Sequence, residues 1–246
     1  MAVDPQIRVQ HEIEHGRKLA NEDTELAWGW GTRAGSLRVE QRSSLVIRGA
    51  GLKPGMHVLE IGCGTGLFTS IFSRTGADII AIELVPELLE KARARNVPNA
   101  TFIEGRFEDY PGEAVFDAVI GNSILHHLDV EAALERIFHL LKPGARMSFA
   151  EPNMMNPQVF LERHFYYLPI FDNTSPDETA FLRWRLRSLL KRMGYEDIRI
   201  QLFDWLHPHT PDGLVPAVKK MSNILERVPL IREISGCMAV SARRPF

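Results

Sequence analysis

Carboxylates and a glycine-rich turn stand where successive apolar segments end, and these residue types can hold a small polar ligand. The first segment, His57 to Ile61, leads into Gly62-Cys63-Gly64-Thr65-Gly66. Glycines tolerate positive φ and carry no side chain, so the backbone N–H groups of such a turn can approach a ligand closely. Glu83 ends the next apolar segment, where a carboxylate can accept hydrogen bonds from both hydroxyls of a ribose.

The spacing of the glycines separates classes of nucleotide ligand. The dinucleotide pattern G-x-G-x-x-G needs a further glycine where this chain has Leu67, so a bound pyrophosphate is disfavoured. Glu60, two residues before the first glycine, adds a carboxylate that suits a cationic amine better than a phosphate.

Two adjacent histidines, His126 and His127, follow the fourth apolar segment and could act as general bases. In the alternative explanation, one ring packs in the core and the other makes a local hydrogen bond. The segment His207-Pro208-His209 carries two more imidazoles without a third ligand nearby in sequence, and we interpret it as a turn. No metal site is predicted.

Short apolar segments alternate with helical patterns from about residue 36 to residue 204, which predicts a parallel sheet with crossover helices. The expected strands are 57–61, 78–82, 100–103, 116–120, 146–150, 198–203 and 237–242. Asp129 should cap a helix that stops at Lys142-Pro143-Gly144. A later helix should begin at Ser175, with Pro176 in its first turn and Glu178 completing a capping box, and end at Gly194.

The chain divides into an expected helical cap, residues 1–50, and a core, residues 51–246. Two insertions, at about 151–174 and 206–235, follow the fifth and sixth strands and are expected to form a lid. Long segments without periodicity are more often functional than accidental. Their aromatic and polar side chains are predicted to line a pocket for a second molecule: Glu151, Asn153, Phe165, Tyr166, Tyr167 and Trp205.

Composition excludes several classes of protein. The 246 residues are 45% hydrophobic and 24% charged with a formal net charge of -2, which is ordinary for a globular protein and predicts no nucleic-acid partner. Two separated cysteines, Cys63 and Cys237, indicate neither a disulfide framework nor a zinc site. No apolar run approaches the ~20 residues of a membrane span, and the cytoplasm is the expected location. Monomer and homodimer are both open.

As a set, these motifs resemble those of the class I S-adenosylmethionine (SAM)-dependent methyltransferases. The segment from Val58 to Gly66 resembles their first motif, and Glu83 falls at their ribose-binding acid. The segment from Asn122 to Leu128 resembles the one after their fourth strand, and Leu141-Lys142-Pro143-Gly144 matches the one before their fifth. The resemblance covers roughly residues 36–204. It implies a Rossmann-like, doubly wound α/β fold with a mostly parallel seven-stranded sheet, and SAM across the C-terminal strand ends.

The resemblance also implies which residues meet the methionine part of the cofactor. Gly62, Cys63 and Gly64 would pass under the methionine and ribose, while Glu60 would orient the amino group. In a subgroup resembling quinone-biosynthesis O-methyltransferases, an arginine upstream of the first strand meets the SAM carboxylate. Here that residue is Arg42, and its competitors for the role are Arg33, Arg38 and Arg48. Asn122 matches a position that faces the methionine.

At the adenine end, Leu84 would contact the ring face. Where the family often has an aspartate that meets the adenine amino group, this chain departs with Arg106. Phe107 can supply a stacking wall there. Glu108 or a backbone carbonyl could then take the amino group.

Methyl transfer is an in-line displacement that needs positioning, and needs a base only when the acceptor is a poorly ionised hydroxyl. His126 is the preferred base because its family counterpart faces the acceptor, with His127 as the second candidate. The predicted activity is methylation of a mid-sized, partly apolar small molecule at oxygen. Methylation at nitrogen or carbon and a non-catalytic SAM-binding subunit remain alternatives; a nicotinamide oxidoreductase is disfavoured by Leu67 and Glu60.

Overall fold

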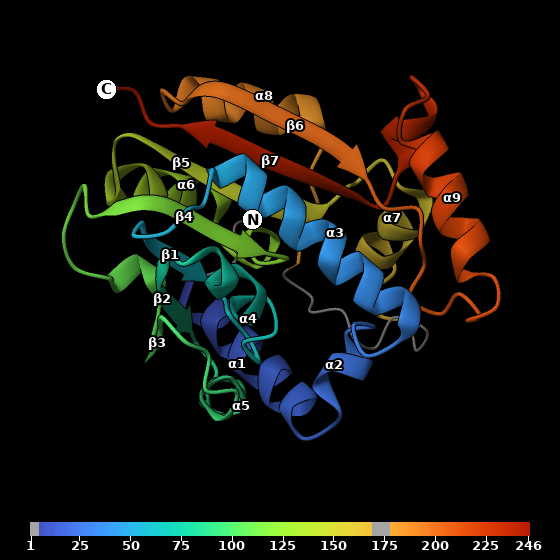
Figure 1. The fold of residues 1–246 in the computed structure, drawn as a ribbon, viewed down its shortest axis with the longest axis horizontal. Coiled ribbons are helices and arrows are strands. Elements are labelled where there is room, and N and C mark those ends of the chain that lie inside the picture. Colours follow the sequence, from blue (N-terminus) through green and yellow to red (C-terminus); the bar gives the residue numbers. More distant parts are fainter. Residues whose placement is uncertain (1–4, 169–177) are drawn as a thin grey trace.

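Seven strands form one mixed sheet in the order β3-β2-β1-β4-β5-β7-β6 (Figure 1) in the computed structural model, which describes residues 5–168 and 178–246. The strands are β1 (His57–Ile61), β2 (Asp78–Glu83), β3 (Ala100–Glu104), β4 (Phe116–Asn122), β5 (Leu141–Pro152), β6 (Glu196–Phe203) and β7 (Cys237–Arg243). Only β7 runs antiparallel to its neighbours β5 and β6. The predicted mostly parallel, seven-stranded sheet is confirmed.

The central strands are buried on both faces, which explains why they read as continuous apolar runs. In β1, Leu59 and Ile61 belong to an apolar cluster that includes side chains of α6 (Val130–Leu140) and α8 (Arg183–Arg192). The alternating residue Val58 belongs to a second cluster with α3 (Arg33–Ala50), α4 (Thr69–Phe72) and α5 (Pro86–Ala94). Helices therefore cover both faces, as the doubly wound prediction required.

Local signals set the helix ends that matter for the site. Asp129 caps α6, its side chain accepting a hydrogen bond from the N–H of Ala132. The helix ends at Leu140, and β5 continues directly through the Lys142-Pro143-Gly144 segment that was predicted to stop it. Pro86 occupies the first turn of α5, immediately after the loop that follows Glu83.

The helices of the first 50 residues pack in two different places. Helix α3 packs on the sheet, whereas α1 (Pro5–Ala20) and α2 (Thr24–Ala27) lie beside α5 (Figure 1). Arg17 forms an ion pair with Glu87 at 3.0 Å, and the Lys91 ammonium donates to the carbonyl of Ala20 at 2.7 Å. These contacts anchor α1 next to the turn that follows β2.

The predicted helix start at Ser175 lies outside the described residues, and the prediction that Glu178 belongs to that helix is wrong. Helix α8 begins at Arg183, and the chain before it is extended. Phe181 forms a parallel bridge with Asn153, with its N–H donating to the carbonyl of Pro152 at 3.1 Å. Pairing with the end of β5 and burial of Phe181 outweigh the capping signal.

The two insertions hold short helices. The first contains α7 (Pro157–His164), capped by the side chain of Asn156, and the second contains α9 (Val215–Leu225). None of the helices in residues 5–168 and 178–246 has the length and apolar character needed to cross a membrane.

Candidate active site

A pocket of about 1010 Å³ opens at the C-terminal ends of β1, β2 and β4, where open α/β sheets bind ligands. Its walls come from the glycine turn, the ends of these strands, α1, α7 and the segment after β6. Its volume lies at the upper end of the range for small-molecule sites.

The glycine turn forms the floor of the pocket. Gly62 and Gly64 have φ of +65° and +54°, which L side chains rarely adopt. A Cβ on Gly62 would lie 2.6 Å from the Ile124 side chain, and one on Gly64 would lie 3.1 Å from the indole of Trp28. The turn therefore needs glycine for both conformation and space.

Glu83 ties this turn to the end of β2. Its Oε2 accepts the N–H of Gly64 at 2.8 Å, and its Oε1 accepts those of Leu84 and Val85 at 2.8 and 2.9 Å. Burial raises the pKa of Glu83, and the three backbone donors oppose that rise. A carboxylate so oriented on the pocket wall keeps one lone pair, on Oε2, for a hydroxyl of a ribose.

Glu60 takes a different position. It is buried beneath the turn, its Oε2 has no hydrogen-bond partner within the described parts of the chain, and it does not belong to the pocket wall. Burial raises its pKa to about 8, and the charge of Glu83 adds to the rise. Its predicted role toward an amino group would require a bridging group.

Arg42 is buried at the meeting point of β4, β6 and β7. Its guanidinium donates to Asn122 Oδ1 at 3.3 Å and to Ser123 Oγ at 3.1 Å, and it stacks over the ring of Trp30. Asp204 accepts from it at 3.5 Å. Burial would raise the pKa of Asp204, but Arg38 and Arg42 outweigh that effect and lower it.

Arg38 shares this position and pairs with Asp204 at 3.0 Å, so two of the predicted arginines reach the pocket. Arg33 instead contacts the carbonyl of Asp212, and Arg48 contacts Ser44. Of the predicted cofactor contacts, nine line the pocket: Arg42, Gly62, Cys63, Gly64, Glu83, Leu84, Arg106, Phe107 and Asn122. At the predicted adenine end, Arg106 pairs with Glu108 at 3.6 Å.

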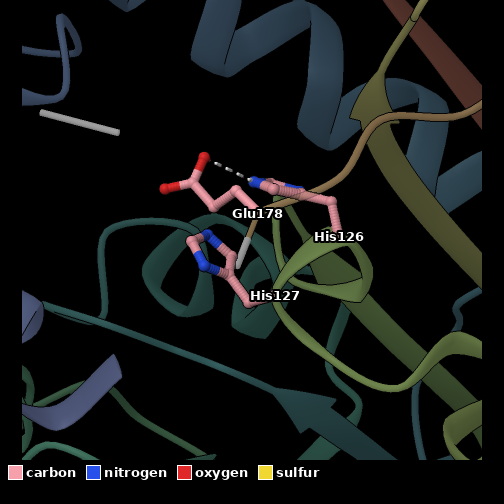
Figure 2. A group of neighbouring side chains, drawn as sticks. All are labelled: His126, His127 and Glu178. Atoms are coloured by element: carbon pink, nitrogen blue, oxygen red, sulfur yellow. Dashed lines mark ion pairs between the residues drawn. The ribbon is translucent and has the colours of Figure 1, made fainter. Parts of the chain in front are cut away.

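His126 and His127 lie on the same pocket wall, in a 3-10 turn after β4. His126 Nδ1 lies 2.8 Å from Glu151 Oε2, and its Nε2 faces Glu178 Oε2 at 3.8 Å (Figure 2). His127 Nδ1 forms an ion pair with Glu12 of α1 at 2.8 Å. The two rings are 4.2 Å apart between centroids.

The environments of the two rings separate their protonation states. Burial lowers the pKa of His126 well below its usual range, and the neighbouring charge on His127 lowers it further. Burial would also lower the pKa of His127, but Glu12 and Glu178 outweigh it and raise the pKa to about 9. Near neutral pH, His126 is neutral and His127 is charged.

Within the parts of the chain that the structure describes, His126, His127 and Glu178 form one group whose potential metal-ligand atoms lie within 4.8 Å of one another. Each imidazole already faces a further carboxylate through Nδ1, and Arg163 pairs with Glu178 at 2.5 Å. The guanidinium supplies positive charge where a cation would bind. That the site uses no metal remains a prediction.

The acceptor-side prediction from the two insertions is wrong for most of its residues. Phe165, Tyr166 and Tyr167 are 38–67% exposed and do not line the pocket. Glu151 is fully buried behind His126, and Asn153 binds the backbone carbonyls of residues 233 and 235. Of the six, Trp205 alone lines the pocket. The sequence analysis missed the lining residues that come from α1, α7 and the segment before α8: Glu12, His15, Arg163 and Glu178.

Comparisons with known proteins agree with this geometry. The methyltransferase domain family matches residues 58–144. An uncharacterized methyltransferase of Synechocystis is 28% identical over 67% of this chain and 78% of that protein. Ubiquinone biosynthesis O-methyltransferase of Xylella fastidiosa is 39% identical, but the match spans only 38% of this chain and 40% of that enzyme.

Among solved structures, phosphoethanolamine N-methyltransferase 2 of Haemonchus contortus in complex with SAM shares the fold. Its TM-score is 0.60 at 16% identity, over 84% of this chain and 53% of that one. In this chain, the glycine turn and the buried carboxylate of Glu83 lie together on the pocket wall at the strand ends. The chain contains a methyltransferase domain at residues 58–144 and shares its fold with a SAM-bound methyltransferase, and these findings support SAM as its cofactor.

Proposed function

We propose that this protein transfers the methyl group of SAM to a hydroxyl of a mid-sized, partly apolar small molecule, with His126 as the base. What carries the proposal is the geometry of the wall that also holds Gly62 and Glu83, where Nδ1 of His126 lies 2.8 Å from Glu151 and Nδ1 of His127 lies 2.8 Å from Glu12. These surroundings lower the pKa of His126 and raise that of His127 to about 9. His127 already carries a proton and cannot accept another, so His126 is the ring available as a base.

SAM supplies a methyl group bonded to a positively charged sulfur. As the acceptor's O–H bond breaks, its proton goes to Nε2 of His126. SAM held beside Gly62 and Glu83 would supply the methyl group to that oxygen, and its sulfur would keep the electron pair of the broken carbon–sulfur bond. Arg42 and Asn122 hold the pocket wall at the end of β4, next to the turn that carries the two histidines.

A prepared base favours oxygen over nitrogen as the methylated atom. A neutral amine offers its lone pair without losing a proton first, whereas a poorly ionised hydroxyl gains from proton removal during attack. The match to an O-methyltransferase over two fifths of that enzyme's length supports the same choice. The pocket volume supports an acceptor bound beside the cofactor.

The experiment follows methyl-labelled SAM with a panel of substituted phenols and anilines of matching shape. We expect transfer to phenols, and His126→Ala should lower kcat about 100- to 10,000-fold while the SAM Kd changes less than about twofold. His139→Ala, on the exposed face of α6, is the matched control and should keep wild-type turnover. Transfer to anilines alone would refute the choice of oxygen, and wild-type turnover in His126→Ala would refute the base.

A further inference from the structure

Glu151, at the end of β5, binds three consecutive residues of the turn that presents the proposed base. Its side chain is fully buried. Oε1 accepts the backbone N–H groups of Ile124 and Leu125 at 3.1 and 3.0 Å, and Oε2 lies 2.8 Å from Nδ1 of His126. One carboxylate therefore sets both the path of the backbone and the orientation of the ring.

This arrangement decides which nitrogen of His126 carries the proton. Burial raises the pKa of Glu151 to about 7, and the two backbone donors on Oε1 oppose that rise. Above that pKa the carboxylate is ionised and can only accept hydrogen bonds. The ring must then donate through Nδ1, and a neutral imidazole has one proton, so Nε2 keeps its lone pair. Nε2 is the atom on the side of Glu178 (Figure 2).

The backbone of His126 is held from the other side. Its carbonyl accepts hydrogen bonds from the N–H and the hydroxyl of Thr179, at 3.0 and 3.2 Å. With the carbonyl fixed by Thr179 and Nδ1 fixed by Glu151, the ring has little freedom to turn. An imidazole held in this way needs no reorganisation when an acceptor arrives.

We propose that Glu151 is the positioning residue for His126. It keeps the proton on Nδ1, so that Nε2 can take the proton of the acceptor's hydroxyl, and its negative charge stabilises the imidazolium that results. The inference rests on the proposed function for His126 as the base. A purely structural role for Glu151 needs only an oxygen that accepts the N–H groups of Ile124 and Leu125.

Glu151→Gln separates the two roles. The glutamine keeps one oxygen for the two backbone donors, but its NH₂ group then faces Nδ1, which must accept. The ring proton moves to Nε2 and the base is lost. We expect turnover of the phenol acceptors to fall about 100-fold or more, with the SAM Kd changed less than about twofold.

The second readout is the tautomer itself, from ¹⁵N NMR of protein labelled at histidine nitrogens and assigned with His126→Gln. Wild type should show the Nδ1–H form for His126 near pH 7.5, and Glu151→Gln should show the Nε2–H form. Turnover within twofold of wild type in Glu151→Gln would overturn the proposal, and so would a loss of turnover with an unchanged tautomer.

Two outcomes keep the inference distinct from the proposed function. If His126→Ala is inactive while Glu151→Gln is fully active, Glu151 is only structural and the base stands. If His126→Ala turns over normally, the base is wrong. Should Glu151→Gln fail to fold, the wild-type spectrum still decides, since an Nε2–H form in wild type contradicts the proposal.

Discussion

The carboxylate of Glu83 has two tasks that a single substitution can separate by magnitude. It accepts three backbone hydrogen bonds, from Gly64, Leu84 and Val85, at 2.8 to 2.9 Å. It also lines the pocket at the predicted ribose position. In Glu83→Gln one oxygen becomes an NH₂ group, which must face either the donor of Gly64 or those of the other two residues.

The cost to stability follows from the donors left unpaired. A hydrogen bond to a charged group is worth about 1.5–3 kcal/mol, and at least one is lost whichever way the amide turns. We therefore expect Glu83→Gln to lower the free energy of unfolding without cofactor by about 1.5–3 kcal/mol, measured by urea denaturation. The side chain is 8% exposed, so solvent screening reduces this little.

The effect on the cofactor is larger than stability alone explains. If a ribose hydroxyl donates to Glu83, losing that charged acceptor weakens SAM binding by a further 1.5–3 kcal/mol, or about 10- to 100-fold in Kd. Titration calorimetry at a temperature where the variant stays folded measures this directly. Glu104→Gln is the matched control, because Glu104 pairs in register with Glu83 on the neighbouring strand yet is exposed.

Two results would contradict this account of Glu83. Wild-type SAM affinity in Glu83→Gln would show that no cofactor group donates to this carboxylate. An equal loss of affinity in Glu104→Gln would show that the effect comes from the general charge at this edge of the sheet.

Two further predictions concern the floor of the pocket. Gly64→Ala places a Cβ 3.1 Å from the indole of Trp28, at a residue whose φ is +54°, so SAM affinity measured by calorimetry should fall at least about tenfold. The control is Gly213→Ala, whose Cβ would meet nothing within 4 Å, and this variant should bind SAM with wild-type affinity. Glu60 has a folded pKa of about 8 against an ordinary 4.5, so its contribution to stability is complete below pH 4.5 and lost as pH rises toward 8. The free energy of unfolding of wild type minus that of Glu60→Gln, measured by urea denaturation without cofactor, should fall by up to about 1.4 kcal/mol per pH unit across that window. A difference that stays constant with pH would disprove the raised pKa of Glu60.

The part of the pocket wall predicted to hold the cofactor was predictable from sequence because it is built from short-range units. A strand, a glycine turn and an acid at the end of the next strand lie within residues 57–83, and parallel pairing of β1 with β2 brings them to one edge. The strand boundaries followed from apolar runs between turn residues. Glu60 is the one predicted cofactor contact that does not line the pocket. Alternation along a strand predicts which face of the sheet a side chain lies on, but it does not predict how deeply that side chain is buried below the turn.

The part of the pocket wall around the two histidines was not predictable from sequence, for reasons that are equally physical. Glu12 reaches His127 only because α1 packs on α5, and no local pattern encodes that long-range contact. The sequence around Glu178 matches a capping box and predicted a helix there, but Phe181 forms a parallel bridge with Asn153 and the helix begins only at Arg183. The aromatic run at Phe165 has the composition of a pocket wall, but composition does not say which side of a lid faces inward.

The adjacent histidines show how one residue type acquires two roles. Both rings lie on the same wall, His126 buried and His127 half-buried, and desolvation alone would lower the pKa of each. The difference comes from the carboxylates: His127 faces Glu12 and gains a proton, and its charge then lowers the pKa of His126. The division of labour therefore depends on α1 staying in place, because without Glu12 the charge on His127 weakens. Helix α1, which lines the pocket, therefore contributes to the electrostatics of His126, the proposed base.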